Sequence, residues 1–273
     1  ATTMADATLP TVAMDTEAGT QYNVLHGYTS ELDSTLFYGN ITPVAKDRKL
    51  TVTINTYGED IEGVAYKIRS LEDKSLIENT EVSDYDNAGS SINVTFNIKN
   101  LLDTGKEYAL EVVLKTKKHE AVYYYTRIVY GVDYDLQKKL DFVMNFNACT
   151  FDDSRLKDIS GYLETSSSGD NTNYGKVNIN CSLSQVGWGD LDPYVESDIM
   201  PEVISVDDDV AILRLGYRVG AANDYSSSDT YTVSEYYRIR QTNSGFYLLN
   251  FEREMNQVFD ARNDLTSTAT INL

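Results

Sequence analysis

The sequence predicts two domains of different classes: an all-β sandwich, followed by an α+β domain whose helices pack on a curved antiparallel sheet. Three observations indicate this division. The chain has 273 residues, enough for two domains that each bury a core. Strand-like runs without a helical pattern fill residues 21–132. From residue 133, two amphipathic helical patterns precede a series of strands.

The predicted organisation is a linker over residues 1–20, a sandwich over 21–132, an α+β domain over 133–262 and a tail over 263–273. The first twenty residues are rich in Thr, Ala and Asp and lack periodicity, as linkers do. The chain opens with "ATTMADATLPTV" and ends with the alternating "TATINL". We therefore expect a leader or membrane anchor upstream and a possible further domain downstream.

The strands of the predicted sandwich show an alternation of apolar and polar residues. In "KLTVTINTYG" Leu50, Val52 and Ile54 share one face, and "SSINVTFNIKNL" repeats the pattern. The runs "KEYALEVVLKTK" and "AVYYYTRIVYG" predict a hairpin across "KKHE". Strands at this spacing, without helices between them, are typical of a β-sandwich.

The second half begins with helical spacing. Leu136, Leu140 and Val143 in "DYDLQKKLDFVMNF" lie on one helical face. The stretch "DDSRLKDISGYLET" predicts a second helix with Asp and Ser at its N-terminus. Predicted strands follow in "KVNINCSLSQV", "VAILRLGYRVG", "DTYTVSEYYRIRQ" and "GFYLLNFERE", the last two joined by a turn at "TNSG". Helices followed by antiparallel strands indicate an α+β domain.

One segment of the first half, "NLLDTGKEYALEVVLK", resembles the E–F corner of fibronectin type III domains. The resemblance depends on Leu102, Gly105 and Tyr108, and it covers residues 45–131. It implies a structural role for these three residues, with the Tyr108 ring buried and its hydroxyl bonded to nearby backbone. The chain departs from the family in having Thr104 where proline is common, and in lacking a tryptophan on the second strand.

The second half resembles the α+β roll of nuclear-transport-factor-2-like proteins. The resemblance depends on the order of elements and on the ending "YYRIRQTNSGFYLLNFE", which is similar to the final long hairpin of that family. It implies helices packed into a strongly curved sheet. The composition of the whole chain is similar to that of surface proteins of Gram-positive bacteria.

Charge and motifs exclude several classes of function. With 42 acidic and 23 basic residues the net charge is −19, which disfavours nucleic acid and anionic membranes as partners. No apolar run is long enough for a transmembrane helix, so we expect membrane attachment only through an anchor outside this sequence. The chain has no P-loop, no G-x-G-x-x-G and no G-x-S-x-G, and we expect no cofactor.

Cysteine and histidine usage makes a zinc site improbable. There is no CxxC, and His26 and His119 are the only histidines. Cys149 and Cys181 are interpreted first as free buried cysteines, with a disulfide as the alternative.

The most acidic candidate site is "GWGDLDPYVESD", which contains the only tryptophan, Trp188. An acidic surface turn is the favoured interpretation. A calcium site is the first alternative, because calcium takes six to eight oxygen ligands. A catalytic carboxylate pair of a glycosidase is the second. The carboxylates concerned are Asp190, Asp192, Glu196 and Asp198.

Two further groups could bind a ligand. Tyr123 and Tyr125 share one face of a predicted strand, where exposed rings could stack on sugars; sheet packing is the favoured interpretation. Four arginines fall on the alternate face of two neighbouring strands and could hold an anion; ion pairing with the abundant carboxylates is favoured. These are Arg214, Arg218, Arg238 and Arg240.

The sequence as a whole predicts a non-enzymatic structural or interaction module, located at the cell surface or outside the cell and anchored or secreted. Its expected partner is another surface protein or a cell-wall component. A carbohydrate- or peptide-binding module that uses exposed aromatics is the alternative, and a hydrolase acting on cell-wall polymers comes third.

Overall fold

The computed structural model describes residues 8–222 and 228–258 of the chain. Its residues divide into two compact units. Unit 1 comprises residues 1–140 and 200–213, and unit 2 comprises residues 141–199 and 214–273. Unit 1 is therefore assembled from two stretches that are far apart in the sequence.

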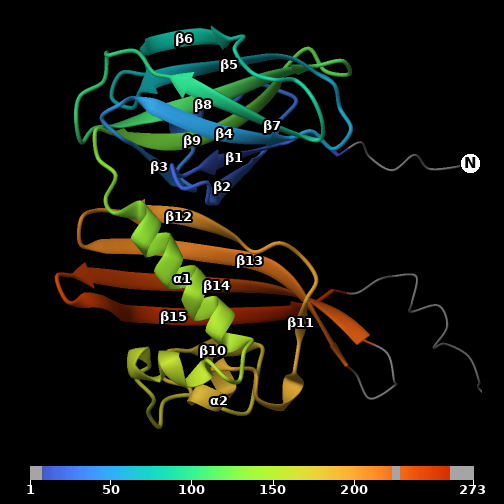
Figure 1. Cartoon of the computed structure of the whole chain (residues 1–273), viewed down its shortest axis with the longest axis vertical. Helices are drawn as coiled ribbons and strands as arrows, with labels where there is room; N and C mark the ends of the chain where they lie inside the picture. The colour runs from blue at the N-terminus through green and yellow to red at the C-terminus, as the bar shows by residue number, and fades with distance from the viewer. Residues whose placement is uncertain (1–7, 223–227, 259–273) are drawn as a thin grey trace, which may run out of the picture. The chain divides into compact units, whose positions relative to one another are not determined.

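Unit 1 contains two sheets (Figure 1). Neighbouring strands are antiparallel in both, except that β3 is parallel to β9. In spatial order, the first sheet contains β2 (Gln21–His26), β1 (Thr11–Asp15), β4 (Lys49–Asn55) and β7 (Ser91–Asn97). The second contains β3 (Ile41–Val44), β9 (Val122–Tyr130), β8 (Glu107–Thr116), β5 (Ile61–Ser70) and β6 (Leu76–Val82).

The core of unit 1 lies between these sheets. Tyr66 of β5 stacks on Phe96 of β7 with ring centroids 4.6 Å apart, so a side chain from each sheet meets in the middle. Asn23 attaches a distant strand: its Nδ2 donates to the Ile41 carbonyl and its Oδ1 accepts from the Val203 amide. Val203 belongs to β12 (Met200–Val206), so this buried side chain ties residues 200–206 to the N-terminal part of the unit.

Tyr108 lies at a corner of unit 1. Its side chain is buried, and its hydroxyl accepts a hydrogen bond of 2.8 Å from the Asp103 amide. Leu102 is also buried. Gly105 has a φ of +78°, in the left-handed region that glycine adopts without a steric penalty. Leu102 and Gly105 therefore lie in the connection before β8, and Tyr108 is the second residue of that strand.

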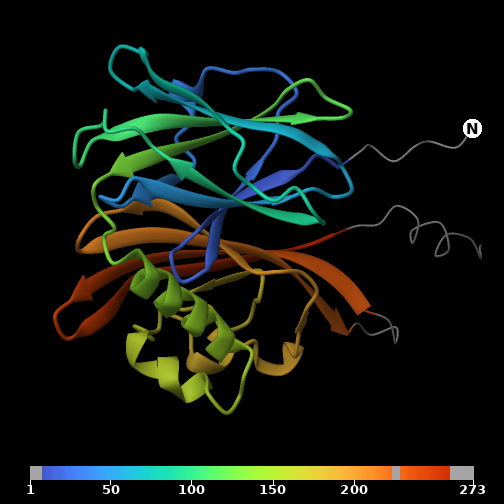
Figure 2. The same ribbon diagram turned by 45° about the horizontal axis from the view of Figure 1, so that its top comes forward.

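Unit 2 is built on a sheet of long strands, which curve visibly in Figure 2. The helix α1 (Leu136–Thr150), whose first residues belong to unit 1, packs on it: Phe146 contacts Tyr237 and Phe251, with centroids 5.6 and 5.2 Å away. The spatial order is β10 (Lys176–Asn178), β15 (Gly245–Gln257), β14 (Ser228–Thr242), β13 (Val210–Ala222) and β11 (Tyr194–Val195), and β12 also pairs with β13.

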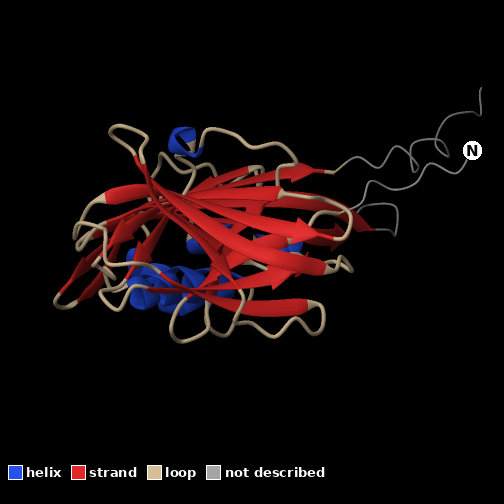
Figure 3. Cartoon of the chain, turned by 90° about the horizontal axis from the view of Figure 1, so that it is seen from above, coloured by secondary structure: helices blue, strands red, loops and turns tan. Residues whose placement is uncertain are grey.

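The predicted fold class, an all-β sandwich followed by an α+β domain, is wrong. Strands hold 48% of the described residues and helices 13%, so the chain is predominantly β and has three sheets (Figure 3). The first predicted helix is present as α1. The second is only a 3₁₀ helix, η2 (Leu156–Tyr162), in which Ile159 alone is buried. One buried side chain gives too little apolar contact to stabilise a longer helix next to Gly161.

Two other segments differ from the sequence prediction. The predicted strand "KVNINCSLSQV" ends at Asn178, and Ser182 then caps the short helix α2 (Leu183–Val186) by accepting a hydrogen bond from the Gln185 amide. Residues 1–20, predicted as a linker, contain β1, which pairs with β2 and β4. Its buried Val12, Ala13 and Met14 are consecutive, so no alternation marks the strand. The predicted tail, residues 263–273, lies outside the described residues.

Candidate functional site

The predicted acidic loop directly follows a buried tryptophan. The Trp188 side chain is 1% exposed, and its backbone has a φ of +71° where the 3₁₀ helix η3 (Gly189–Leu191) begins. The four carboxylates, Asp190, Asp192, Glu196 and Asp198, are all exposed. Across residues 8–222 and 228–258, no three His, Cys, Asp or Glu side chains form a group that could hold a metal ion. The acidic side chains of this loop are therefore in contact with solvent.

Trp188 is covered by Arg253, which the sequence analysis did not single out. The guanidinium carbon lies 3.5 Å from the centre of the Trp188 ring, a close cation–π contact. The Nη1 of Arg253 donates to the Val186 carbonyl at 2.8 Å, and its Nη2 donates to the Gln185 carbonyl at 3.2 Å. Arg253 therefore fixes the end of α2 and the indole ring together.

The charge opposite Arg253 is Glu235, whose Oε2 lies 3.9 Å from Arg253 Nη1. Its Oε1 accepts hydrogen bonds from Asn147 Nδ2 at 2.6 Å and from the Tyr237 hydroxyl at 2.9 Å. Burial raises the pKa of Glu235, and the attraction of Arg253 opposes that rise. Both charged side chains are 0% exposed, so the pair holds elements of unit 2 together without contacting solvent.

A signal for this pair is present in the sequence. Val233, Tyr237 and Ile239 alternate on the buried face of β14, and the same parity places Glu235 on that face. Phe251 places Arg253 on the buried face of β15 in the same way. The hairpin register then sets Glu235 directly opposite Arg253. An acid and a base at matching inward positions of one hairpin predict a buried ion pair.

The four predicted arginines lie on the other face. Because Leu213, Leu215, Tyr217 and Val219 are buried, the side chains between them on β13 point outward. Arg214, Arg218, Arg238 and Arg240 are all exposed. They therefore do not line the face of the sheet that packs on α1.

Tyr123 and Tyr125 lie beneath a surface segment. Tyr123 forms an isolated bridge with Tyr28, and the Tyr125 ring stacks on Phe37 with centroids 4.4 Å apart. The hydroxyl of Tyr125 also accepts a hydrogen bond of 2.7 Å from the Leu32 amide. Tyr125 is consequently buried and forms part of the support for residues 28–38 rather than an open binding surface.

Residues 28–38 present a group of exposed apolar side chains, which the sequence analysis missed. Tyr28, Leu32, Leu36 and Tyr38 are 43%, 41%, 65% and 59% exposed, and we call these four the 28–38 surface. The segment includes the 3₁₀ helix η1 (Ser34–Leu36), capped by Asp33. It follows neither helical nor strand periodicity, so no pattern could indicate it.

Ion pairs connect the segment that carries the 28–38 surface to other residues of unit 1. Lys74 Nζ lies 2.7 Å from Asp33, and Lys67 Nζ lies 3.0 Å from Glu31 and 3.2 Å from the buried Glu111. On one side, the guanidinium of Arg127 covers the Tyr38 ring at 4.5 Å. Paired charges therefore lie within the same segment as the four exposed apolar side chains.

Comparisons with known proteins give little guidance. No family model matches the chain, and no curated protein matches it either. Among solved structures, the chain is similar to the sporulation control protein Spo0M of Bacillus subtilis. The two share 8% identity over 80% of this chain and 86% of that one, with a TM-score of 0.22. No helix in the described parts of the chain has the length and apolar character needed to cross a membrane.

Proposed function

We propose that the chain is a non-enzymatic interaction module that binds another protein through the 28–38 surface. The observation that carries the proposal is the exposure of four large apolar side chains within eleven residues, on a segment held by buried contacts. Large apolar side chains that are exposed together with nearby charged residues are typical of protein-binding sites. Because the segment is already anchored, its binding costs little conformational entropy.

The ionisable groups of unit 2 support a structural role in preference to catalysis. Among the ion pairs of the described residues, Glu235 and Arg253 are the pair most removed from solvent, and each side chain is 0% exposed. A catalytic group must come within hydrogen-bond reach of its substrate. A pair sealed between α1 and the sheet instead stabilises one arrangement of the core. The location at the cell surface or outside the cell stays a prediction from the sequence.

The test is capture with matched variants. Leu36 and Leu101 are both exposed leucines of unit 1, at 65% and 58%. We expect the wild type and Leu101→Asp to retain the same protein from a surface extract, and Leu36→Asp to lose it. With the captured protein purified, Leu36→Asp should weaken its binding about tenfold or more, a loss of about 1.4 kcal/mol. Equal binding by both variants would refute the proposal.

A carbohydrate ligand is the second candidate, because the rings of Tyr28 and Tyr38 are exposed. Two features favour a protein. Leu32 and Leu36 contribute to the same surface, although aliphatic side chains do not stack on sugars as aromatic rings do. Arg127 also occupies one face of Tyr38. Binding to cell-wall glycans that is lost in Tyr38→Ser and kept in Leu36→Asp would favour the carbohydrate.

A further inference from the structure

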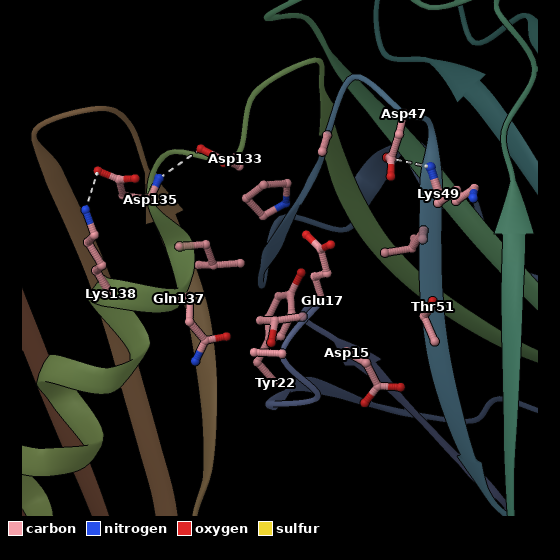
Figure 4. A pocket seen from close by; sticks show the side chains of 16 residues that line it. Asp15, Glu17, Tyr22, Asp47, Lys49, Thr51, Asp133, Asp135, Gln137 and Lys138 are labelled. Carbon is pink, nitrogen blue, oxygen red and sulfur yellow. Dashed lines mark hydrogen bonds and ion pairs between the residues drawn. The ribbon is translucent and has the colours of Figure 1, made fainter.

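A second candidate site lies in unit 1, away from the 28–38 surface. It is a half-open pocket of about 680 Å³, and every residue that lines it belongs to unit 1. Figure 4 shows β4 on one side of the pocket, the stretch 133–138 on the other, and Glu17 and Tyr22 between them. The pocket therefore combines residues from three separate parts of the sequence.

The lining of this pocket is strongly acidic. It contains five carboxylates and two lysines, which give a net formal charge of −3. Lys138 pairs with Asp135 at 3.8 Å, and the Asp15 carboxylate accepts a 2.6 Å hydrogen bond from the Thr53 hydroxyl. The carboxylates belong to Asp15, Glu17, Asp47, Asp133 and Asp135.

Tyr22 is a second and independent indication of a ligand. Only 2% of its side chain is exposed, yet it lines the pocket and its hydroxyl makes no hydrogen bond to any residue in the described ranges. Burial and the nearby Asp15 carboxylate raise the pKa of Tyr22, so the hydroxyl is neutral and can accept a hydrogen bond. The hydroxyl oxygen is not among the unpartnered atoms that are sealed from solvent, and Tyr22 lines the pocket, so a ligand in the pocket can reach this oxygen.

The pocket also has apolar wall residues, among them Pro43, Leu50 and Leu136. The carboxylates are distributed around the space, with Asp47 and Asp133 on opposite sides in Figure 4. In the described residues they do not gather in a group of three that could hold a metal ion. A larger cation with an aliphatic stem fits such a lining better, because its charge can face the carboxylates while the stem contacts the wall.

We propose that this pocket binds an organic cation, an ammonium or guanidinium group on an aliphatic stem. The Tyr22 hydroxyl accepts one N–H hydrogen bond, and the carboxylates of Glu17 and Asp47 compensate the charge. The cation comes either from a Lys or Arg side chain of a peptide or from a free alkylamine. This site shares no residue with the 28–38 surface, so the two proposals can fail independently.

The test uses three probes and backbone amide shifts from NMR. Acetyl-Gly-Arg-Gly-amide is the peptide probe, its citrulline analogue is the neutral isostere, and agmatine is the free amine. At low ionic strength we expect the arginine peptide to shift the amides of Thr16, Ala45 and Lys49 in a saturable way, and the citrulline peptide to leave them unchanged. If agmatine binds more tightly than the arginine peptide, the natural ligand is a free amine. If the arginine peptide binds more tightly, the ligand is a peptide.

Matched variants distinguish a specific binding site from general electrostatic attraction to an acidic protein. Glu17→Gln with Asp47→Asn changes two exposed carboxylates of the pocket, while Glu62→Gln with Asp103→Asn makes the same charge change elsewhere on unit 1. We expect the first pair to weaken binding about tenfold and the second to have little effect. Tyr22→Phe should weaken it about threefold. Equal effects of the two pairs, or equal binding of the citrulline peptide, would overturn the proposal.

Discussion

Glu235 and Arg253 face each other across β14 and β15, with 3.9 Å between Glu235 Oε2 and Arg253 Nη1 and no solvent exposure of either side chain. Each charge has other partners: Asn147 and Tyr237 bind the carboxylate, and two backbone carbonyls bind the guanidinium. Desolvation of two charges is costly, and the hydrogen bonds of Glu235 Oε1 and of the two Arg253 Nη atoms offset only part of that cost, because Glu235 Oε2 and Arg253 Nε have no hydrogen-bond partner.

Removal of one member of this ion pair should strongly destabilise the folded protein. We expect Arg253→Met to lower the free energy of unfolding by about 3–5 kcal/mol, because it leaves the Glu235 carboxylate buried without its counter-charge. Arg253→Met combined with Glu235→Leu should cost less than the sum of the single changes. Urea denaturation followed by circular dichroism gives the three values. Additive costs would show that the two side chains do not interact.

Removal of the Tyr108 hydroxyl tests whether its hydrogen bond stabilises the fold. Tyr108→Phe removes the acceptor of the Asp103 amide, and we expect a loss of about 1 kcal/mol or more in the free energy of unfolding. Tyr57→Phe is the matched control, since Tyr57 is 58% exposed. Thermal or urea denaturation of both variants provides the measurement. A Tyr108→Phe protein as stable as the control would argue against a structural role for the hydroxyl.

The carboxyl group of Asp33 should titrate at low pH. Hydrogen bonds from Lys74 and Thr35 lower its pKa from 3.8 to about 2. Since the folded pKa is the lower one, the stabilisation is complete above pH 4 and is lost as the pH falls toward 2. In Lys74→Met the pKa should rise toward 3.8. An NMR titration of the carboxyl carbon follows it, and an unchanged pKa in the variant would mean that Lys74 does not hold the segment.

Calcium should not affect the acidic loop. The four carboxylates after Trp188 are exposed and belong to no group of metal-binding geometry among the described residues. A bound ion would stabilise the folded state by about 2.7 kcal/mol at one hundred times its Kd. We expect no shift in melting temperature and no change in Trp188 emission with calcium or chelator. A chelator-reversible shift that disappears in Asp190→Asn with Asp192→Asn would establish a site.

Part of the fold could be predicted from the sequence. The alternation at Leu50, Val52 and Ile54 marks β4, and the spacing of Leu136, Leu140 and Val143 marks α1, because in each case one face is buried. The "TNSG" turn joins β14 to β15 as predicted. Where burial is continuous, as in β1, or where helical spacing is not matched by burial, as in η2, the pattern does not specify the structure.

The contacts of the predicted site residues also could not be predicted from the local sequence. The aromatic run around Tyr125 indicates an unusual segment, but the neighbours of this side chain in space are Phe37 and Leu32, about ninety residues earlier in the chain. The sequence places acidic residues next to Trp188, whereas the Trp188 ring contacts Arg253. Local composition identified both residues as unusual. Their contacts depend on long-range pairing, which no spacing within one segment encodes.

The return of β12 to unit 1 has a consequence for synthesis on the ribosome. Residues 141 to 199, 59 in all, separate the two stretches of chain that make up this unit. At about 5–20 residues per second, their translation takes roughly 3–12 s. During that interval Asn23 of β2 lacks the Val203 amide from which its side chain accepts a hydrogen bond in the finished protein. The nascent chain must therefore keep its first unit incomplete, and available to chaperones, until about half of the second has been translated.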